Sequence, residues 1–253
     1  MHKIGTRRST DSSSRRSVMR LASLSLLPAA ALMMHALSTQ AEVQARAERV
    51  DAAVVLAVDV SGSINADRYA LQMEGIAKAL EDREVQRVLL SGPNRSTFVA
   101  LVEWSNTASL TIPWTLITSR SDAQAFADRV RLAPRVDNQF TCMSRALQLV
   151  EGKVIPFLPV PADRTVIDVS GDGHDNCNLN PPVDAVRDEL VATGVTINGL
   201  PILEGDEAAT LASWYRDHVI GGSGGFLVPA RGFADFQRAM RRKFIVEISA
   251  RSP

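Results

Sequence analysis

The sequence predicts a doubly wound α/β domain: a mostly parallel central sheet, helices on both faces, and one edge strand that is expected to run antiparallel. Runs of β-branched and aliphatic residues alternate with stripes of apolar residues at helical spacing, the pattern of strands joined by helical crossovers. The first run, residues 54–58, is apolar without alternation, which indicates a strand buried on both faces. Pro113 interrupts a later run, which is typical of an edge strand.

Length and composition predict one globular domain preceded by a leader. The chain has 253 residues, of which 45% are hydrophobic and 22% charged, and its formal net charge is zero. The charge is unevenly distributed, because residues 1–41 carry a net charge of +5 and residues 42–253 a net charge of −5. An acidic body gives no electrostatic reason to expect nucleic acid or an anionic membrane as a partner.

Residues 1–41 have the organisation of an export signal peptide. Basic residues come first, an apolar segment follows over 21–37, and the small residues of 39–41 suit cleavage after Ala41. Residues 14–20, with Arg15 and Arg16, resemble the twin-arginine export motif. We therefore expect a periplasmic or secreted protein whose mature part, residues 42–253, has no integral membrane segment; an uncleaved anchor is the alternative.

The elements follow in order along the mature part. A strand over about 52–58 precedes a helix for which Asn65 is the expected N-cap, and its apolar face recurs at helical spacing from Tyr69 to Leu80. The next elements predicted are a strand at 97–102, the edge strand at 109–117, a helix capped by Ser121 and stopped by Pro134, and a helical stripe from Met143 to Val150.

The second half repeats the same alternation. We predict strands at 165–169, 195–202 and 226–228, helices that begin near Val183 and Glu207, and a closing helix with Phe233, Phe236, Met240 and Phe244 on its apolar face. Gly194 is expected to end the first of these helices. The glycines of 221–225 predict a turn, since no Lys-Ser or Lys-Thr follows as in a phosphate-binding loop. The basic run Arg238, Arg241, Arg242 and Lys243 predicts a solvated helix face.

Oxygen-bearing side chains follow three of the predicted elements or loops. Asp59, Ser61 and Ser63 come after the first strand, Asp172 comes after the strand at 165–169, and Thr141 ends a polar loop. In a doubly wound sheet the carboxyl ends of the strands share one edge, where ligands bind, so these side chains could converge. Hard oxygen donors suit Mg²⁺, Mn²⁺ or Ca²⁺ and do not match a zinc site built from His and Cys.

These residues resemble the metal-ion-dependent adhesion site of the von Willebrand factor A domain. That site combines an Asp-x-Ser-x-Ser loop, matched by residues 59–63, with a distant Thr and a distant Asp, matched by Thr141 and Asp172. The resemblance covers residues 50–248, and residues 166–173 resemble an uncharacterised group of exported bacterial proteins with this domain. It implies a divalent cation, Mg²⁺ first, held by Asp59, Ser61, Ser63, Thr141 and Asp172.

Several neighbouring residues have more than one interpretation. Ser61 and Ser63 could cap the following helix while Asp59 stabilises a turn, with no metal at all. The loop before Thr141, residues 137–140, lacks the glycines that are common there in the family, and Phe140 would narrow access to the metal. His174 and Asp175 would lie at the rim of the site or in a solvated loop. Asp168, inside its strand, is interpreted as a structural carboxylate.

The two cysteines, Cys142 and Cys177, follow Thr141 and Asp172 closely. If both loops meet at the metal, the cysteines are neighbours, and we predict a Cys142–Cys177 disulfide, which an oxidising compartment permits. It would close a loop of about 35 residues and contribute about 3 kcal/mol. Two separate thiols are the alternative.

The resemblance implies a non-catalytic binding module whose metal accepts an Asp or Glu carboxylate from a partner protein. The rival hypothesis is a metal-dependent phosphohydrolase with an aspartyl nucleophile, but such enzymes usually carry a second acid two residues later, where this chain has Ser61. A structural domain with a vestigial site is the third interpretation.

Overall fold

The computed structural model describes residues 49–135 and 139–249, and the expected export signal lies outside them. Its sheet has five strands in the order β3-β2-β1-β4-β5. The central strand β1 (Ala52–Asp59) pairs in parallel with β2 (Thr97–Trp104) and with β4 (Thr165–Gly171), and β4 pairs in parallel with β5 (Thr196–Pro201). The edge strand β3 (Ala108–Ile117) runs antiparallel to β2. The predicted fold class is confirmed, including the antiparallel edge strand that contains Pro113.

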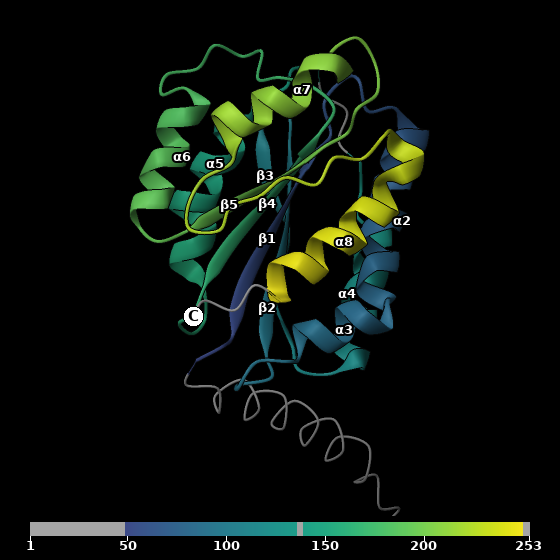
Figure 1. Ribbon diagram of the computed structural model, residues 1–253, viewed down its shortest axis with the longest axis vertical. Helices are drawn as coiled ribbons and strands as arrows, with labels where there is room; N and C mark the ends of the chain where they lie inside the picture. The colour runs from purple at the N-terminus through teal and green to yellow at the C-terminus, as the bar shows by residue number, and fades with distance from the viewer. Residues whose placement is uncertain (1–48, 136–138, 250–253) are drawn as a thin grey trace, which may run out of the picture. The chain divides into compact units, whose positions relative to one another are not determined.

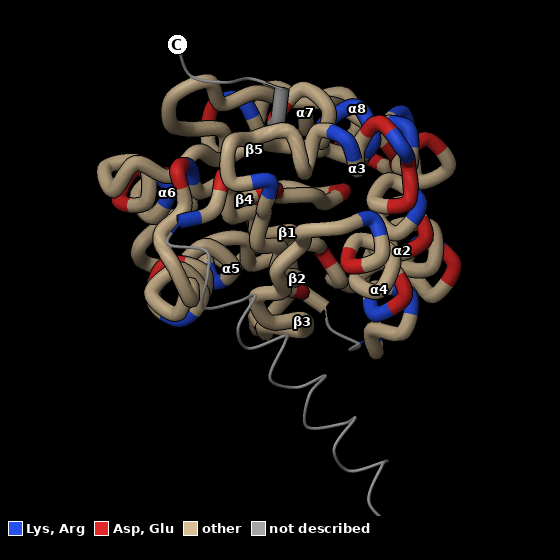
Figure 2. The backbone as a smooth tube through the Cα atoms, turned by 90° about the horizontal axis from the view of Figure 1, so that it is seen from below, with Lys and Arg blue, Asp and Glu red and all other residues tan. Residues whose placement is uncertain are grey.

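Helices cover both faces of the sheet (Figure 1). Alternate residues of β1 belong to different cores: Leu56 packs with α2, α4 and α8, whereas Val55 packs with α5, α6 and α7. Figure 2 looks along the strands, which follow one another from β5 to β3 between the two helical layers. A strand buried on both faces has no polar side to alternate, which explains its continuous apolar sequence.

Local sequence explains where the helices begin and end. In the helix α2, the side chain of Asn65 accepts a hydrogen bond from the backbone N–H of Arg68, as predicted for an N-cap. The cap of α4 is Ser119 and not Ser121: the Ser119 hydroxyl accepts the N–H of Asp122, so the helix starts two residues earlier than predicted. Gly194, at φ +91°, follows α6 in the left-handed conformation that favours glycine. The helices are α2 (Ala66–Glu81), α3 (Arg83–Leu89), α4 (Arg120–Arg131), α5 (Met143–Leu149), α6 (Val183–Ala192), α7 (Ala208–Trp214) and α8 (Phe236–Ser249).

Shorter helical segments extend several of these helices. The π-helix η1 (Val150–Val154) and the 3₁₀-helix η2 (Ile155–Phe157) continue α5, the π-helix η3 (Tyr215–Val219) continues α7, and the 3₁₀-helix η4 (Phe233–Asp235) precedes α8.

Residues 226–228 do not form the predicted strand. Leu227 makes only an isolated bridge with Gly199, although the N–H of Gly199 donates to the Phe226 carbonyl and the N–H of Val228 to the Gly199 carbonyl, both at 3.0 Å. The segment therefore lies along β5 without a continuous ladder. A three-residue apolar run contains too little pattern to distinguish these arrangements.

The predicted basic face of α8 contains one residue that is not solvated. The Lys243 side chain is fully buried, where its ammonium group pairs with the Asp168 carboxylate of β4 and lies 3.5 Å from Glu247 Oε2. Asp168 is thus a structural carboxylate, as predicted, and it faces α8 because it lies opposite Leu56 in the sheet. Helical spacing places Lys243 one turn before Glu247, but only the fold could place Asp168 beside both.

No helix within the described ranges is long and apolar enough to cross a membrane.

Candidate metal centre

Two carboxylates lie at the carboxyl edge of the sheet, on adjacent parallel strands. Asp59 is the last residue of β1, and Asp172 directly follows β4. Asp59 is fully buried, and Asp172 is 6% exposed. Because the strands are parallel neighbours, their ends bring together residues that are far apart in sequence.

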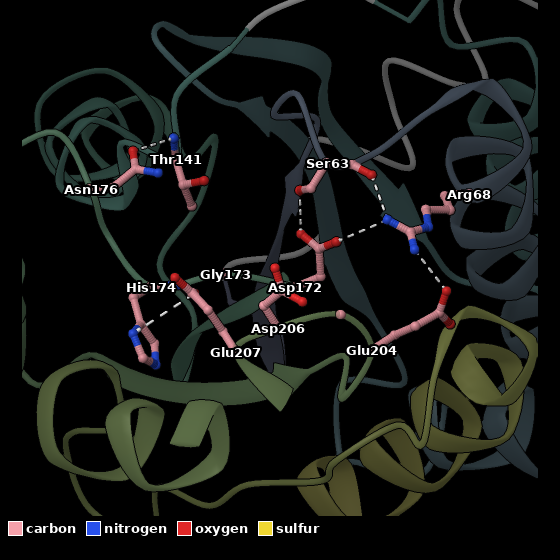
Figure 3. A pocket seen from close by; sticks show the side chains of 11 residues that line it. Ser63, Arg68, Thr141, Asp172, Gly173, His174, Asn176, Glu204, Asp206 and Glu207 are labelled. Carbon is pink, nitrogen blue, oxygen red and sulfur yellow. Dashed lines mark hydrogen bonds and ion pairs between the residues drawn. The ribbon is translucent and has the colours of Figure 1, made fainter. Parts of the chain in front are cut away.

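The loop after β1 is folded tightly around its own oxygens. Asp59 Oδ1 accepts the N–H of Ser61 at 2.7 Å, and the hydroxyls of Ser61 and Ser63 lie 3.3 Å apart. Ser63 Oγ in turn donates to Asp172 Oδ1 at 2.6 Å, which joins the first loop to the loop after β4 (Figure 3). Four of the five predicted ligands are therefore linked in one chain of short contacts.

Thr141 comes to the same place from the loop before α5. It lines a pocket of about 300 Å³ together with Ser63 and Asp172, and its hydroxyl would lie 3.6 Å from a Cβ placed on Gly173. Asp59 and Ser61 are fully buried and do not line this pocket, but the Ser61 hydroxyl contacts that of Ser63, which does. All five predicted side chains thus gather at one edge of the sheet, and their role as metal ligands remains a prediction.

The electrostatics of the site favour a cation. Asp59 Oδ2 is buried and has no hydrogen-bond partner among the described residues. Burial, and to a smaller extent the charge of Asp172, raises the pKa of Asp59 to about 7, while the N–H of Ser61 opposes this shift. Burial also raises the pKa of Asp172, although Ser63 and Arg68 oppose this. Two desolvated carboxylates and three hydroxyls fit a hard divalent ion, which would compensate both charges.

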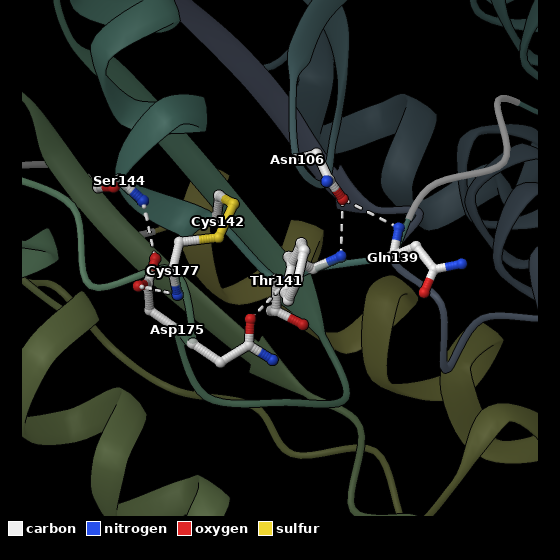
Figure 4. The surroundings of a disulfide bond; sticks show 9 residues. Asn106, Gln139, Thr141, Cys142, Ser144, Asp175 and Cys177 are labelled. Carbon is white, nitrogen blue, oxygen red and sulfur yellow. Dashed lines mark hydrogen bonds between the residues drawn. A yellow bond between two sulfur atoms is a disulfide. The ribbon is translucent and has the colours of Figure 1, made fainter.

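A disulfide joins the two loops that carry Thr141 and Asp172. Cys142 and Cys177 are bonded, with their Cα atoms 5.2 Å apart, as predicted (Figure 4). Next to the bond, the N–H of Thr141 donates to Asn176 Oδ1 at 2.9 Å, and the N–H of Asn176 donates to the Thr141 carbonyl at 3.0 Å. Covalent and reciprocal hydrogen bonds therefore fix Thr141 relative to the loop after β4.

The three expected rim residues have different positions. His174 lines the pocket. Asp175 is not among the residues that line it, and its carboxylate instead accepts the N–H groups of Ser144 and Cys177, which holds the start of α5 and the disulfide loop. Phe140 is not among the residues that line the metal pocket and instead lines a neighbouring hollow.

Sequence reasoning missed Arg68 and the acidic loop after β5. Arg68 donates to the Ser63 carbonyl at 2.7 Å and to Glu204 Oε1 at 2.8 Å, and its guanidinium lies 3.7 Å from Asp172 Oδ2. Glu204, Asp206 and Glu207 complete the pocket wall. They follow the carboxyl end of β5, so the strand-edge rule that identified Asp59 and Asp172 could have found them too.

Removing the disulfide is expected to destabilise the domain. A Cys142→Ser, Cys177→Ser variant should lose about 3 kcal/mol of unfolding free energy, because the bond closes a loop between residues 35 apart in sequence. Urea unfolding without reductant measures this, and wild-type protein with reductant should match the variant. An unchanged midpoint would contradict the expectation.

A methyl group added at Gly171 is expected to lower both the stability of the fold and its affinity for the metal. Its Cβ would lie 2.8 Å from Asp59 Oδ2 and 3.0 Å from the hydroxyl of the buried Tyr215. Gly171→Ala should therefore lower the unfolding free energy by about 1 to 3 kcal/mol and weaken Mg²⁺ binding in a calorimetric titration. Gly152→Ala is the matched control, because a Cβ placed there has no contact with the surrounding structure within 4 Å. Equal stability and Mg²⁺ affinity of the two variants would refute this prediction.

This architecture and topology define a von Willebrand factor A fold. The proximal thread matrix protein 1 of the mussel byssus, solved with a zinc-occupied MIDAS motif, is similar over 79% of this chain and 46% of its own, with TM-score 0.58 and 19% identity. The von Willebrand factor type A protein of Catenulispora acidiphila matches 78% of this chain and 42% of its own, with TM-score 0.54 and 19% identity. The corresponding domain of the type V pili tip protein Mfa5 from Porphyromonas gingivalis matches 81% and 97%, with TM-score 0.56 and 12% identity.

The chain belongs to the DUF1194 family, described as a protein of unknown function, whose model matches residues 49–252. It spans less than half the length of the mussel and Catenulispora proteins. No curated protein matches it.

Proposed function

We propose that this chain is a divalent-cation-dependent protein-binding module without catalytic activity. The cation would be held by Asp59, Ser61, Ser63, Thr141 and Asp172, and it would accept an Asp or Glu carboxylate from a partner protein. The observation that carries the proposal is the convergence of these five oxygen-bearing side chains from three separate loops, with one buried carboxylate oxygen left without a partner.

The donor set supports this chemistry. When bound, the cation supplies an electrophilic centre at the floor of an open pocket. The two carboxylates match the charge of a divalent ion, but five side chains leave at least one position open on an ion that prefers about six or more oxygen ligands. A carboxylate from outside would complete its coordination. The zinc-occupied MIDAS motif of the mussel protein is a precedent for a metal on this fold and adds Zn²⁺ to the ions worth testing.

An enzyme is the less favoured alternative. In the described site, the position two residues after Asp59 is the buried Ser61, where an aspartyl-nucleophile phosphohydrolase would need a proton donor. Turnover of a phosphate ester that Asp59→Asn abolishes would reverse this ranking. We also propose export to the periplasm or beyond, which the Cys142–Cys177 disulfide supports because such bonds persist in oxidising compartments.

Cation-dependent stability is the first test. Saturation at about 100 times the dissociation constant should stabilise the folded chain by about 2.7 kcal/mol, which raises the melting temperature by roughly 5 to 10 °C for a domain of this size. Thermal unfolding with Mg²⁺, Mn²⁺, Ca²⁺, Zn²⁺ or EDTA measures it. A melting temperature that is the same with each of the four ions as with EDTA would favour a vestigial site and refute the proposal.

Protein binding is the second test. A pull-down from the periplasm should recover a partner with Mg²⁺ and lose it with EDTA. Partner recovery that is indifferent to the chelator would show binding by another surface.

A further inference from the structure

A second hollow, of about 250 Å³, lies next to the proposed metal pocket. Phe140, Leu179, Arg145 and the Cys142–Cys177 disulfide line it. Asn176 lines both this hollow and the metal pocket, so the two form one continuous surface around Thr141. A partner segment that places a carboxylate on the metal would extend across one side of this surface or the other.

Phe140 gives the hollow a fixed apolar wall. The residue is 54% exposed, yet its backbone is held, because Asn106 Oδ1 accepts the N–H of Phe140 at 2.7 Å and that of Gln139 at 2.9 Å. An exposed aromatic ring on a fixed backbone, beside Leu179 and the disulfide, can bury an apolar side chain at little conformational cost.

Arg145 gives the hollow a positive charge. It lies in the first turn of α5, is exposed, and has no ion pair with any carboxylate of the described residues. Some other arginines of the domain are paired, for example Arg131 with Glu74 and Glu81, and Arg241 with Asp82. In a body that carries a net charge of −5, a cation at the edge of a binding site attracts a partner's carboxylate.

The wall of the metal pocket that follows β5 carries the opposite charge. The wall after β5 presents Asp206 and Glu207, while Glu204 on the same wall is neutralised by Arg68 (Figure 3). A second carboxylate in a partner would be repelled on this side and attracted on the side of Arg145. The charge distribution therefore favours a bound segment that extends from the metal toward Arg145 over one that extends toward the wall after β5.

We propose that the partner segment carries two carboxylates, one for the metal and a second that pairs with Arg145, with an apolar side chain beside it that packs on Phe140. This proposal rests on the proposed function, because the first carboxylate requires the cation.

Peptide selection tests the proposal without a known partner. Short random peptides displayed on phage are bound to the immobilised chain in Mg²⁺ and eluted with EDTA, in parallel on wild type, Arg145→Glu and Arg120→Glu. Arg120, exposed at the start of α4, follows the end of β3 that pairs with Thr97 and so lies at the opposite edge of the sheet. Arg145→Glu should fold, because an acidic residue is favourable in the first turn of a helix.

Wild type and Arg120→Glu should enrich peptides with two carboxylates, whereas Arg145→Glu should enrich peptides in which Lys or Arg replaces the second one. For one selected peptide, Arg145→Glu should weaken Mg²⁺-dependent binding about tenfold, since losing and then reversing a rim charge each cost about threefold. Replacing the second acid of that peptide by Lys should restore the affinity.

The possible failures are distinguishable. If Arg145→Glu selects the same EDTA-sensitive peptides as wild type, the proposed function stands and this inference is overturned. If wild type yields no EDTA-sensitive peptide, the proposed function fails and the inference fails with it.

Discussion

Replacing Lys243 by methionine is expected to lower the free energy of unfolding by about 3 to 5 kcal/mol, the cost of removing one partner from a buried ion pair. The ammonium group of Lys243 lies between Asp168 and Glu247, whose side chains are 1% and 3% exposed. Methionine fills a similar volume but leaves both carboxylates buried without their cation. Urea unfolding at neutral pH measures the loss.

The adjacent Arg242 provides the matched control for this variant. It is exposed on the same helix, so Arg242→Met should change the unfolding free energy by less than about 0.5 kcal/mol. A triple variant, Lys243→Met with Asp168→Asn and Glu247→Gln, removes the orphaned charges and should recover part of the loss. If Lys243→Met is as stable as Arg242→Met, the ion pair has no part in the stability of the fold.

Replacing Asp59 by asparagine is expected to weaken Mg²⁺ binding by roughly 100- to 1,000-fold, the order expected when one partner of a buried charge pair is neutralised. The substitution keeps the shape of the side chain and removes a desolvated charge. Without metal, the variant should therefore unfold at the same or a higher temperature than wild type, because burial raises the pKa of Asp59 to about 7 and its ionised form is costly. Isothermal titration and thermal unfolding measure the two effects.

Asp206→Asn is the matched control for Asp59→Asn. Asp206 also lines the pocket and is exposed, but it is not one of the five proposed ligands. It should retain Mg²⁺ affinity within about threefold, the usual range for a screened charge. Equal losses in both variants would mean that general negative charge, and not a ligand set, attracts the cation.

Most of the fold could be predicted because strong local patterns define it. The apolar run of β1, the Asn65 cap and Pro113 in β3 each have a local cause that does not depend on the rest of the chain. The errors occurred where two local solutions were close in energy. Ser119 and Ser121 could both cap α4, and the run at 226–228 was too short to distinguish a strand from isolated bridges.

The candidate site was predictable to the extent that its residues follow strand ends or match a family motif. The five oxygen-bearing side chains and the disulfide belong to this group. Arg68 does not, because it reaches the site from the first turn of α2 and gives no local sign of doing so. The burial of Lys243 was missed for the same reason: a lysine in a basic run is normally solvated, and only the position of Asp168 on β4 changes that.

The proposed ligands are dispersed along the chain, and this has a consequence for biosynthesis. Ser63 and Asp172 are 109 residues apart, and the strands that bring their loops together are not consecutive in the sequence. A nascent chain that ends before β4 holds only fragments of the donor set, and no fragment has the charge to retain a divalent ion. Metal capture would thus report that β1 and β4 have paired, and partner engagement would be restricted to molecules that have reached this stage.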